Sequence, residues 1–233
     1  MAEMIAIVGE SGTGKTTSIR NLNPDETFII STTGKRPGIP GSKKKYPNFT
    51  IKDGNFEGNF YTSSNVENII KVLKLIDSKM LNIKNIVFDD FQYIMGFEAM
   101  DKAEQKSYDK FTLIAQHAYQ VLKTAMSLRD DLSFIVITHS TNDGDKLNPY
   151  FRIKTQGKML DNVITLEGLF TYVFFTTVQV DPETNSTKYL FITNTDGTCT
   201  AKSPMGLFDE QYIDNDLNYV IDKIKEYNDA NWV

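Results

Sequence analysis

Nine residues near the N-terminus constrain the fold of this chain more than any other stretch. They read VGESGTGKT and run from Val8, the last residue of the apolar run MIAIV, to Thr16. Glycine costs backbone entropy at a junction between a strand and a helix, so three glycines there indicate that the backbone needs open space. The pattern Gly9-x4-Gly14-Lys15 followed by Thr16 is that of a phosphate-binding loop, and it stands in the required setting, after a strand and before a helix.

Each part of this loop has a physical task. Backbone amides of a glycine-rich turn can surround a polyphosphate, and amides at the start of a helix supply a positive end for the anion. Lys15 can reach the β- and γ-phosphates, and the Thr16 hydroxyl can ligate Mg²⁺. The sequence therefore predicts a site for a nucleoside triphosphate, ATP, with magnesium. The predicted binding residues are Gly9, Glu10, Ser11, Gly12, Thr13, Gly14, Lys15, Thr16 and Thr17.

Strand and helix patterns alternate over the first 140 or so residues. Short apolar runs predict buried strands, and stretches with helical spacing separate them. The predicted strands are 4–8, 27–31, 85–90 and 132–140. The predicted helices are 15–22, one within 63–80 (with Ser63 or Ser64 as its N-cap and Val66, Ile69, Ile70, Leu73, Ile76 and Met80 on one face) and about 95–128. This alternation predicts an α/β fold, a mostly parallel sheet with helices on both faces.

The last third of the chain changes character. Two β-rich runs, 169–181 and 188–195, flank PETNST and predict a C-terminal hairpin that extends the sheet. Residues 213–228 predict an amphipathic helix with Leu217, Val220, Ile221 and Ile224 facing inward. No repeat or long linker divides the chain, so we expect one domain over residues 1–233.

Two carboxylates follow the third apolar run, IVFDD. Phosphoryl chemistry needs a carboxylate near the metal, at the end of a strand beside the loop. We assign Asp89 to Mg²⁺ and Asp90 to orienting or deprotonating the attacking water. The alternative is that either aspartate caps the next element.

Polar residues also end the fourth apolar run, FIVITHS. If this strand lies between the first and the third, Thr138 and His139 point toward the γ-phosphate, where they could sense it or hold water. A capping or surface histidine is the alternative. His117, within a predicted helix, receives no role.

Composition sets limits on location and partners. No stretch approaches 18 consecutive apolar residues, the N-terminus lacks a basic signal region, and the single cysteine, Cys199, fits a reducing compartment. We therefore expect a cytoplasmic protein without a membrane span. The net charge of −5 does not announce a nucleic-acid binder, but a local basic patch can bind one.

The candidate patch is the 34–47 segment, rich in glycine and proline. Its cations are Lys35, Arg36, Lys43, Lys44 and Lys45. Glycine and proline predict a mobile loop, which with Tyr46 and Phe49 could track single-stranded DNA by charge and stacking. The alternative is a solvated loop held open by its own charge.

With these motifs placed, the chain resembles the RecA-like branch of P-loop ATPases, and more narrowly the short phage ATPases that include the Sak-type single-strand annealing proteins. The stretches that carry the likeness are VGESGTGKTT, IVFDDFQY, FIVITHS, KTQGKMLDN and TAKSPMGLF. The resemblance implies that the fourth strand is inserted between the first and third. It also implies a homo-oligomer whose active site lies between subunits and is completed by a neighbour's cation, Lys202 or else Lys158. The alternative is that both lysines face solvent.

The chain departs from that family at the end of the second strand. RecA-like recombinases often carry a catalytic glutamate there, whereas this chain has Ser31, Thr32 and Thr33. Either Asp90 has taken that role or hydrolysis is slow.

The favoured function is an oligomeric ATPase that acts on DNA in phage-type recombination, single-strand annealing or replication; the annealing role comes from the resemblance alone. One alternative is a nucleotide-switched module of virion assembly or DNA packaging. Another is a small-molecule kinase, although its usual arginine-rich lid is missing because the four arginines are not clustered.

Overall fold

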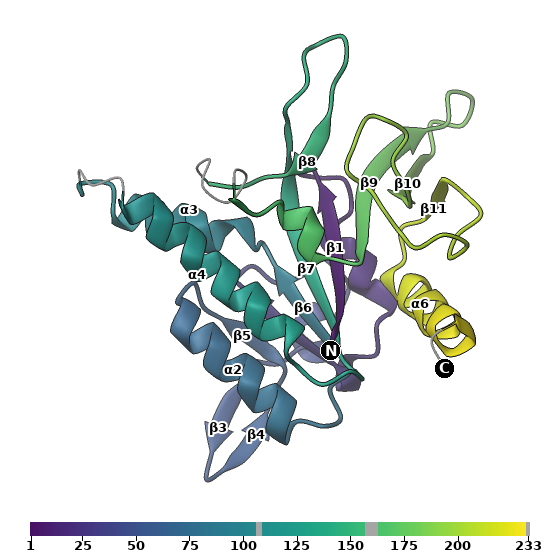
Figure 1. Cartoon of the computed structure of the whole chain (residues 1–233). Coiled ribbons are helices and arrows are strands. Elements are labelled where there is room, and N and C mark those ends of the chain that lie inside the picture. The colour runs from purple at the N-terminus through teal and green to yellow at the C-terminus, as the bar shows by residue number, and fades with distance from the viewer. Residues whose placement is uncertain (106–108, 157–162, 232–233) are drawn as a thin grey trace.

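A computed structural model describes residues 1–105, 109–156 and 163–231, and its centre is a mixed sheet (Figure 1). Neighbouring strands follow the order β11-β10-β9-β1-β7-β6-β2-β5, with β8 paired to β7. Their bounds are β1 (Glu3–Gly9), β2 (Thr27–Ser31), β5 (Phe60–Thr62), β6 (Asn85–Asp89), β7 (Ser133–Asn142), β8 (Phe151–Ile153), β9 (Tyr172–Val180), β10 (Thr187–Ile192) and β11 (Tyr212–Asp214). The pairings from β9 across to β5 are parallel, whereas β10, β11 and β8 are added antiparallel. The predicted class, a mostly parallel sheet with a hairpin extension, is confirmed.

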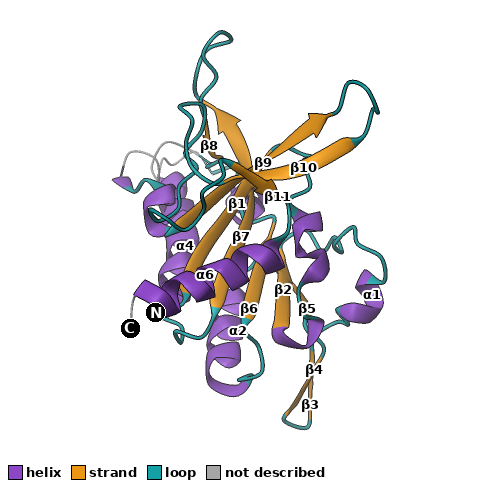
Figure 2. Cartoon of the chain, turned by 90° about the vertical axis from the view of Figure 1, so that its right-hand side faces the viewer, coloured by secondary structure: helices purple, strands orange, loops and turns teal. Residues whose placement is uncertain are grey.

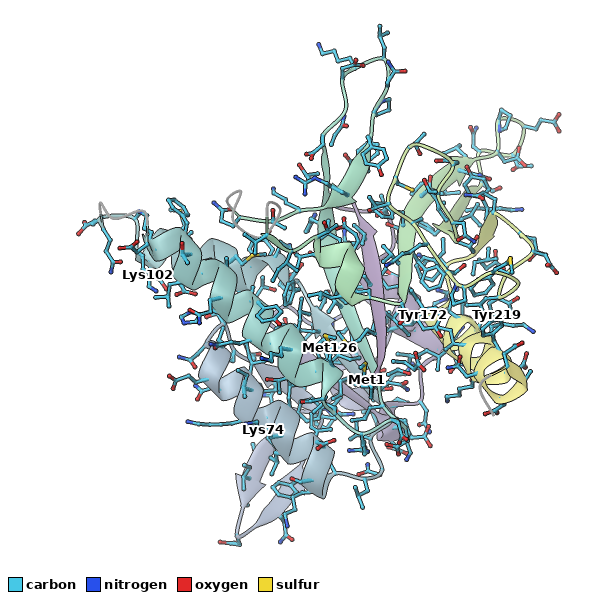
Figure 3. The ribbon with its side chains drawn as sticks, in the orientation of Figure 1. Met1, Lys74, Lys102, Met126, Tyr172 and Tyr219 are labelled. Atoms are coloured by element: carbon cyan, nitrogen blue, oxygen red, sulfur yellow. The ribbon has the colours of Figure 1, made fainter. Side chains whose placement is uncertain are left out.

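Helices cover both faces of the sheet. One face packs against α2 (Val66–Lys79), α3 (Gln92–Asp101) and α4 (Asp109–Met126), and the other against η1 (Thr16–Asn21) and α6 (Leu217–Asn231). Side chains alternate along a strand, so Ala6 and Val8 of β1 join the first core and Ile5 and Ile7 the second. Figure 2 shows α6 on the near side of the sheet and α4 on the far side, and in Figure 3 Tyr219 of α6 lies well apart from Lys74 of α2.

Small elements complete the described chain. They are η2 (Pro24–Glu26), α1 (Ser42–Lys45), the β3 (Thr50–Lys52) and β4 (Asn55–Glu57) hairpin, and η3 (Leu166–Leu169). The β7–β8 and β9–β10 hairpins project past the edge of the sheet where the parallel strands end, and the β3–β4 hairpin lies at the opposite edge (Figure 1). No helix in the described ranges is both long and apolar enough to cross a membrane.

The short helix expected over 15–22 is present as the 3₁₀ helix η1, whereas three other predictions were wrong. The helix expected over 95–128 is two helices, α3 and α4. A continuous helix of that length would run roughly 50 Å, well past the sheet it covers. The N-cap of α2 is Asn65, whose side chain accepts a hydrogen bond from the Asn68 amide at 3.0 Å. The residues at the start of the 213–228 range belong to β11, because they pair with β10.

The 34–47 segment is held in place rather than free. The Arg36 guanidinium donates to the Tyr46 carbonyl and to Asn48 Oδ1, and it lies 3.9 Å from the centroid of the Phe60 ring. Tyr46 is 1% exposed, and Phe49 packs against the core. The expectation of a mobile loop that stacks bases on Tyr46 and Phe49 was therefore wrong, because both rings are used to attach the segment to the sheet.

Gly54 and Gly58, which follow this segment in the sequence, allow the cost of a left-handed backbone to be compared with the cost of a steric clash. Gly54 and Gly58 both have a positive φ, +80° and +77°, but only at Gly58 would a Cβ meet a neighbour, 2.2 Å from the Asn48 carbonyl oxygen. We expect Gly54→Ala to lower the free energy of unfolding by about 1–2 kcal/mol and Gly58→Ala by roughly 3 kcal/mol or more. Urea unfolding of the two variants measures this, and equal losses would contradict the close approach of the Asn48 backbone to Gly58.

A candidate nucleotide site

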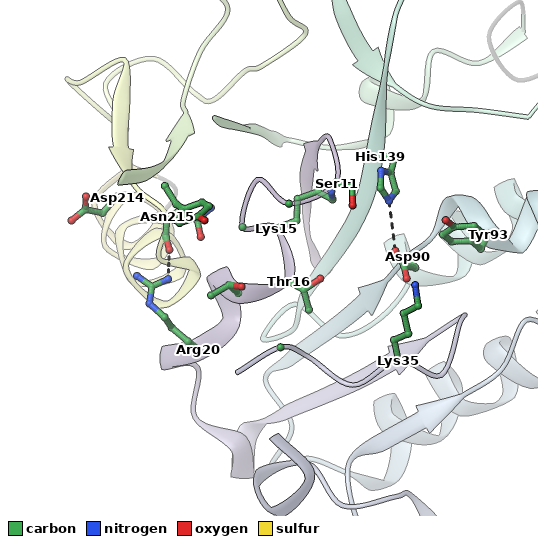
Figure 4. Close-up of a pocket in the computed structure, with 15 residues that line it drawn as sticks. Ser11, Lys15, Thr16, Arg20, Lys35, Asp90, Tyr93, His139, Asp214 and Asn215 are labelled. Atoms are coloured by element: carbon green, nitrogen blue, oxygen red, sulfur yellow. Dashed lines mark hydrogen bonds and ion pairs between the residues drawn. The ribbon is translucent and has the colours of Figure 1, made fainter. Parts of the chain in front are cut away.

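The phosphate-loop pattern lies at one wall of a cavity of about 920 Å³, at the edge where β1, β7, β6 and β2 end (Figure 4). Residues from six parts of the chain line it: Ser11, Gly12, Gly14, Lys15, Thr16, Thr17, Arg20, Lys35, Gly38, Asp90, Tyr93, His139, Tyr189, Asp214 and Asn215. Six of the nine predicted loop residues are therefore at the cavity. The other three, Gly9, Glu10 and Thr13, do not line it, although the Glu10 carbonyl oxygen accepts hydrogen bonds from the Thr13 hydroxyl and Lys15 Nζ within the loop.

Lys15 is held inside the loop. Its Nζ donates to the Glu10 carbonyl oxygen at 2.7 Å, which draws the amine across the turn. Burial lowers the pKa of Lys15, and the negative charges of Asp89, Asp90 and Glu10 oppose that shift. The acids thus favour a charged amine at the place where phosphate oxygens would bind.

The loop glycines are required for different reasons. Gly12 and Gly14 have positive φ values of +84° and +88°. Residues with a side chain rarely adopt this left-handed backbone conformation. At Gly9 the reason is a neighbouring strand, because a Cβ there would lie 2.0 Å from Thr176 Oγ1 of β9. That hydroxyl is 2.5 Å from Thr13 Oγ1, so β9 holds the loop from its far side.

Thr16 and Asp89 lie together, as predicted for a magnesium site. The Thr16 hydroxyl donates to the two carboxylate oxygens of Asp89 at 3.1 and 3.3 Å. Asp89 is 5% exposed, and its burial, together with the charge of Asp90, raises its pKa to about 7. Mg²⁺ prefers oxygen ligands, usually one or two carboxylates with phosphates and water completing its shell. The Thr16 hydroxyl and the buried Asp89 carboxylate fit this preference, because a bound cation would stabilise the ionised carboxylate.

Asp90 leaves the strand and faces the cavity. Its φ is +63°, in the left-handed region that a non-glycine residue seldom occupies. The Thr33 hydroxyl donates to Asp90 Oδ2 at 3.0 Å, and His139 Nε2 lies 4.0 Å from Asp90 Oδ1 (Figure 4). Two neighbouring strands therefore hold this carboxylate in one orientation. Sequence reasoning missed Thr33, since a threonine after a strand carries no signal of its own.

Thr138 and His139 are neighbours within β7, and their side chains point to opposite sides of the sheet. His139 lines the cavity, and burial and the charge of Lys15 lower its pKa, so the imidazole is neutral near pH 7. Thr138 is fully buried, and its hydroxyl donates to Gln92 Oε1 at 3.0 Å. The expectation that Thr138 points to the γ-phosphate was wrong, because alternation along β7 turns it away when His139 faces the cavity.

Lys202, the first candidate to act on a neighbour's nucleotide, does not line this cavity. Lys202 pairs through its backbone with Val173 of β9, and burial lowers the pKa of its amine while the charge of Glu167 opposes that shift. Lys158 lies outside the described residues. The structure thus brings together Lys15, Thr16, Asp89, Asp90 and His139 among the predicted site residues and leaves Lys202 apart.

Several lining residues carry no recognisable signal in the sequence. Arg20 lies one turn after the loop, Lys35 belongs to the basic segment, and Tyr93 follows the two acids. Tyr189 and Asn215 come from the hairpin extension, more than 170 residues beyond the loop, and reach it only because β9 pairs beside β1. A pattern within one stretch of sequence cannot show such a meeting.

The glycine-rich loop follows β1, the acid pair ends β6, and β7 lies between these two strands, which is the arrangement of a P-loop ATPase. The family described as AAA domain matches residues 1–205, and the chain belongs to that family. A KaiC-like protein from the hyperthermophilic archaeon Pyrococcus horikoshii is similar in structure, with a TM-score of 0.46 and 14% identity over 81% of this chain and 77% of that one. A search of curated proteins found no match.

The buried Asp89 predicts how stability without ligand depends on pH. Its pKa rises from 3.8 to about 7 on folding, so between these values the unfolded chain loses the proton first and stability falls as pH rises. Asp89→Asn removes this cost, so its gain over wild type should grow by up to ~1.4 kcal/mol per pH unit from about pH 4 to pH 7 and then level off. Urea unfolding in EDTA measures it. The exposed Asp130→Asn is the control, and a gain for Asp89→Asn that does not change with pH would contradict the burial of this carboxylate.

Proposed function

We propose that this ATPase hydrolyses ATP with Mg²⁺ at the cavity described above, with Lys15, Thr16, Asp89, Asp90 and His139 as its working residues, and that it acts on DNA. The observation that supports the site is the convergence of these five side chains at one edge of the sheet. They come from three strands that are far apart in sequence, and each has a chemical use in phosphoryl transfer.

Their proposed roles follow from their positions. The loop amides and Lys15 bind the β- and γ-phosphates, and Thr16 and Asp89 hold the magnesium ion, which when bound neutralises charge on the phosphate oxygens. Asp90 accepts a hydrogen bond from the attacking water and aligns it with the γ-phosphorus. Thr33 keeps the Asp90 carboxylate oriented, and the neutral His139 ring is placed to contact the same water or the γ-phosphate.

This arrangement supports the first of the two alternatives for the missing catalytic glutamate, in which Asp90 takes its role. Thr33 stands where RecA-like recombinases often carry that acid, and it donates its hydrogen bond to Asp90. The acid that would activate water thus follows β6, the strand beside β2, and does not follow β2 itself. We propose Asp90 as the residue that replaces the glutamate.

Removing the Asp90 charge should separate turnover from binding. Asn tolerates a left-handed φ and keeps the shape of Asp, so Asp90→Asn should leave Mg-ATP affinity within a few-fold and lower kcat by roughly 10²-fold or more. Thr33→Val should lower kcat less, and Thr33→Ser, which keeps the hydroxyl, should be close to wild type. Phosphate release and calorimetry measure the two quantities, and an Asp90→Asn enzyme with wild-type kcat would exclude this role.

We also propose that the protein is a homo-oligomer in which Lys202 acts on a neighbour's nucleotide, as the resemblance implies. In its own chain Lys202 pairs through its backbone with Val173 of β9 and does not line the cavity, which is compatible with a role at a neighbour's nucleotide. A cation supplied in this way is worth about 10³–10⁵ in rate in related chemistry.

For DNA, the supporting feature is a groove of about 560 Å³ at the sheet edge opposite the nucleotide cavity. Lys44, Lys45 and Lys79 line it, and these lysines are exposed. The 34–47 segment touches both places, because Lys35 and Gly38 line the nucleotide cavity. We propose that single-stranded DNA binds along this segment by charge, in phage-type recombination, annealing or replication in the cytoplasm.

A charge reversal tests the DNA surface. Lys43→Glu/Lys44→Glu/Lys45→Glu should weaken binding to an oligonucleotide at least tenfold and make the slope of log K against log salt shallower by on the order of 2. The matched control reverses three exposed lysines elsewhere, Lys71, Lys74 and Lys225. Fluorescence anisotropy over a salt series measures both, and equal losses in the two triple variants would show that this segment is not a specific DNA surface.

A further inference from the structure

The nucleotide cavity extends past the phosphate loop on the side away from the two acids. In Figure 4, Lys15 and Thr16 lie between Asp90 on one side and Arg20 and Asn215 on the other. The extension is lined by Arg20 of η1, Tyr189 of β10 and Asn215, which follows β11. None of these residues takes part in the hydrolysis proposed above.

The direction of a bound triphosphate follows from this arrangement. Its γ-phosphate must lie toward Asp90 for water to attack it, and Lys15 reaches the middle of the chain of phosphates. The α-phosphate, the ribose and the base then lead away from Asp90, toward the extension formed by Arg20, Tyr189 and Asn215.

Asn215 carries an unused hydrogen-bond donor there. The residue is 2% exposed, and its Nδ2 has no hydrogen-bond partner among the described residues. Its backbone is well fixed, since its amide donates to the Tyr189 carbonyl at 3.1 Å and its own carbonyl accepts from the Arg20 guanidinium. A buried donor without an acceptor costs free energy, so this amide is a place where an acceptor from a ligand would be stabilising.

Tyr189 supplies an aromatic surface beside that donor. Its side chain is 46% exposed and lines the cavity, although its strand is the middle one of the hairpin extension. An ideal Cβ on Gly14 would lie 3.0 Å from Tyr189 Cδ1 and 3.5 Å from Asn215 Nδ2, so the ring and the amide meet at the last glycine of the loop. Bases stack on aromatic rings that are exposed in this way.

We propose that Tyr189 and Asn215 form the subsite for the adenine ring, which stacks on Tyr189 and accepts a hydrogen bond from Asn215 Nδ2 through a ring nitrogen. Arg20 is a positioning residue, because it acts through the Asn215 backbone. This inference rests on the proposed function, since it takes its direction from a triphosphate bound with its γ end at Asp90.

The stacking is tested by comparing ligands with and without a base. Calorimetry would use the non-hydrolysable imido analogue of ATP and tripolyphosphate, each with Mg²⁺. Tyr189→Ala should weaken the ATP analogue tenfold or more, leave tripolyphosphate within twofold, and Tyr189→Phe should bind both as wild type does. An equal loss for both ligands, or no loss for the analogue, would overturn the stacking.

The hydrogen bond is tested by removing one ring acceptor at a time. Among 1-deaza-, 3-deaza- and 7-deaza-ATP, one should bind the wild type at least fivefold more weakly than ATP. In Asn215→Leu, which has the same shape and no donor, that difference should disappear while tripolyphosphate binding stays. Deaza analogues that all match ATP on the wild type, or a difference that persists in Asn215→Leu, would overturn the assignment.

The two proposals fail in different ways. Wild-type protein that does not bind Mg-tripolyphosphate would refute the proposed triphosphate site, and the subsite with it. Tripolyphosphate that binds as tightly as the ATP analogue would refute the base subsite alone.

Discussion

The parallel pairing of β1 with β7 is the constraint on which the rest of the structure depends. The two strands stay in register from Glu3 opposite Ser133 to Gly9 opposite His139, and β6 continues the sheet on the far side of β7. Parallel strands end at the same edge, so this register brings the phosphate loop, His139 and the two acids to one place. A shift by one residue would turn His139 into the core and Thr138 toward the cavity.

The charges at this edge explain why the site is costly without a ligand. Asp89 is buried next to Asp90, and neither burial nor a like charge favours its ionised form. Lys15 is buried beside them and bonded to the loop that it serves. The protein thus carries groups whose charges a bound triphosphate and cation would balance. Such perturbed groups, gathered in one cavity, are typical of functional sites.

The hairpin extension gives the chain more than an added sheet edge. β9 pairs beside β1, and Thr176 of β9 contacts the loop at Gly9 and Thr13. β10 and β11 then bring Tyr189 and Asn215 to Gly14. The basic segment enters the cavity from the other side, through Lys35 and Gly38. The same cavity is therefore built from the start, the middle and the end of the chain, which offers a physical route for coupling nucleotide binding to other surfaces.

By itself, the sequence determined the class of sheet, the phosphate loop and the acids, because each is a local pattern of period or spacing within a few residues of one strand. Tertiary structure alone decided that Thr33 orients Asp90, that Thr138 is buried against Gln92, that Tyr46 and Phe49 attach the basic segment, and that Tyr189 and Asn215 reach Gly14. These contacts join residues from different strands. They depend on strand order, register and packing of side chains, which no single stretch of sequence encodes.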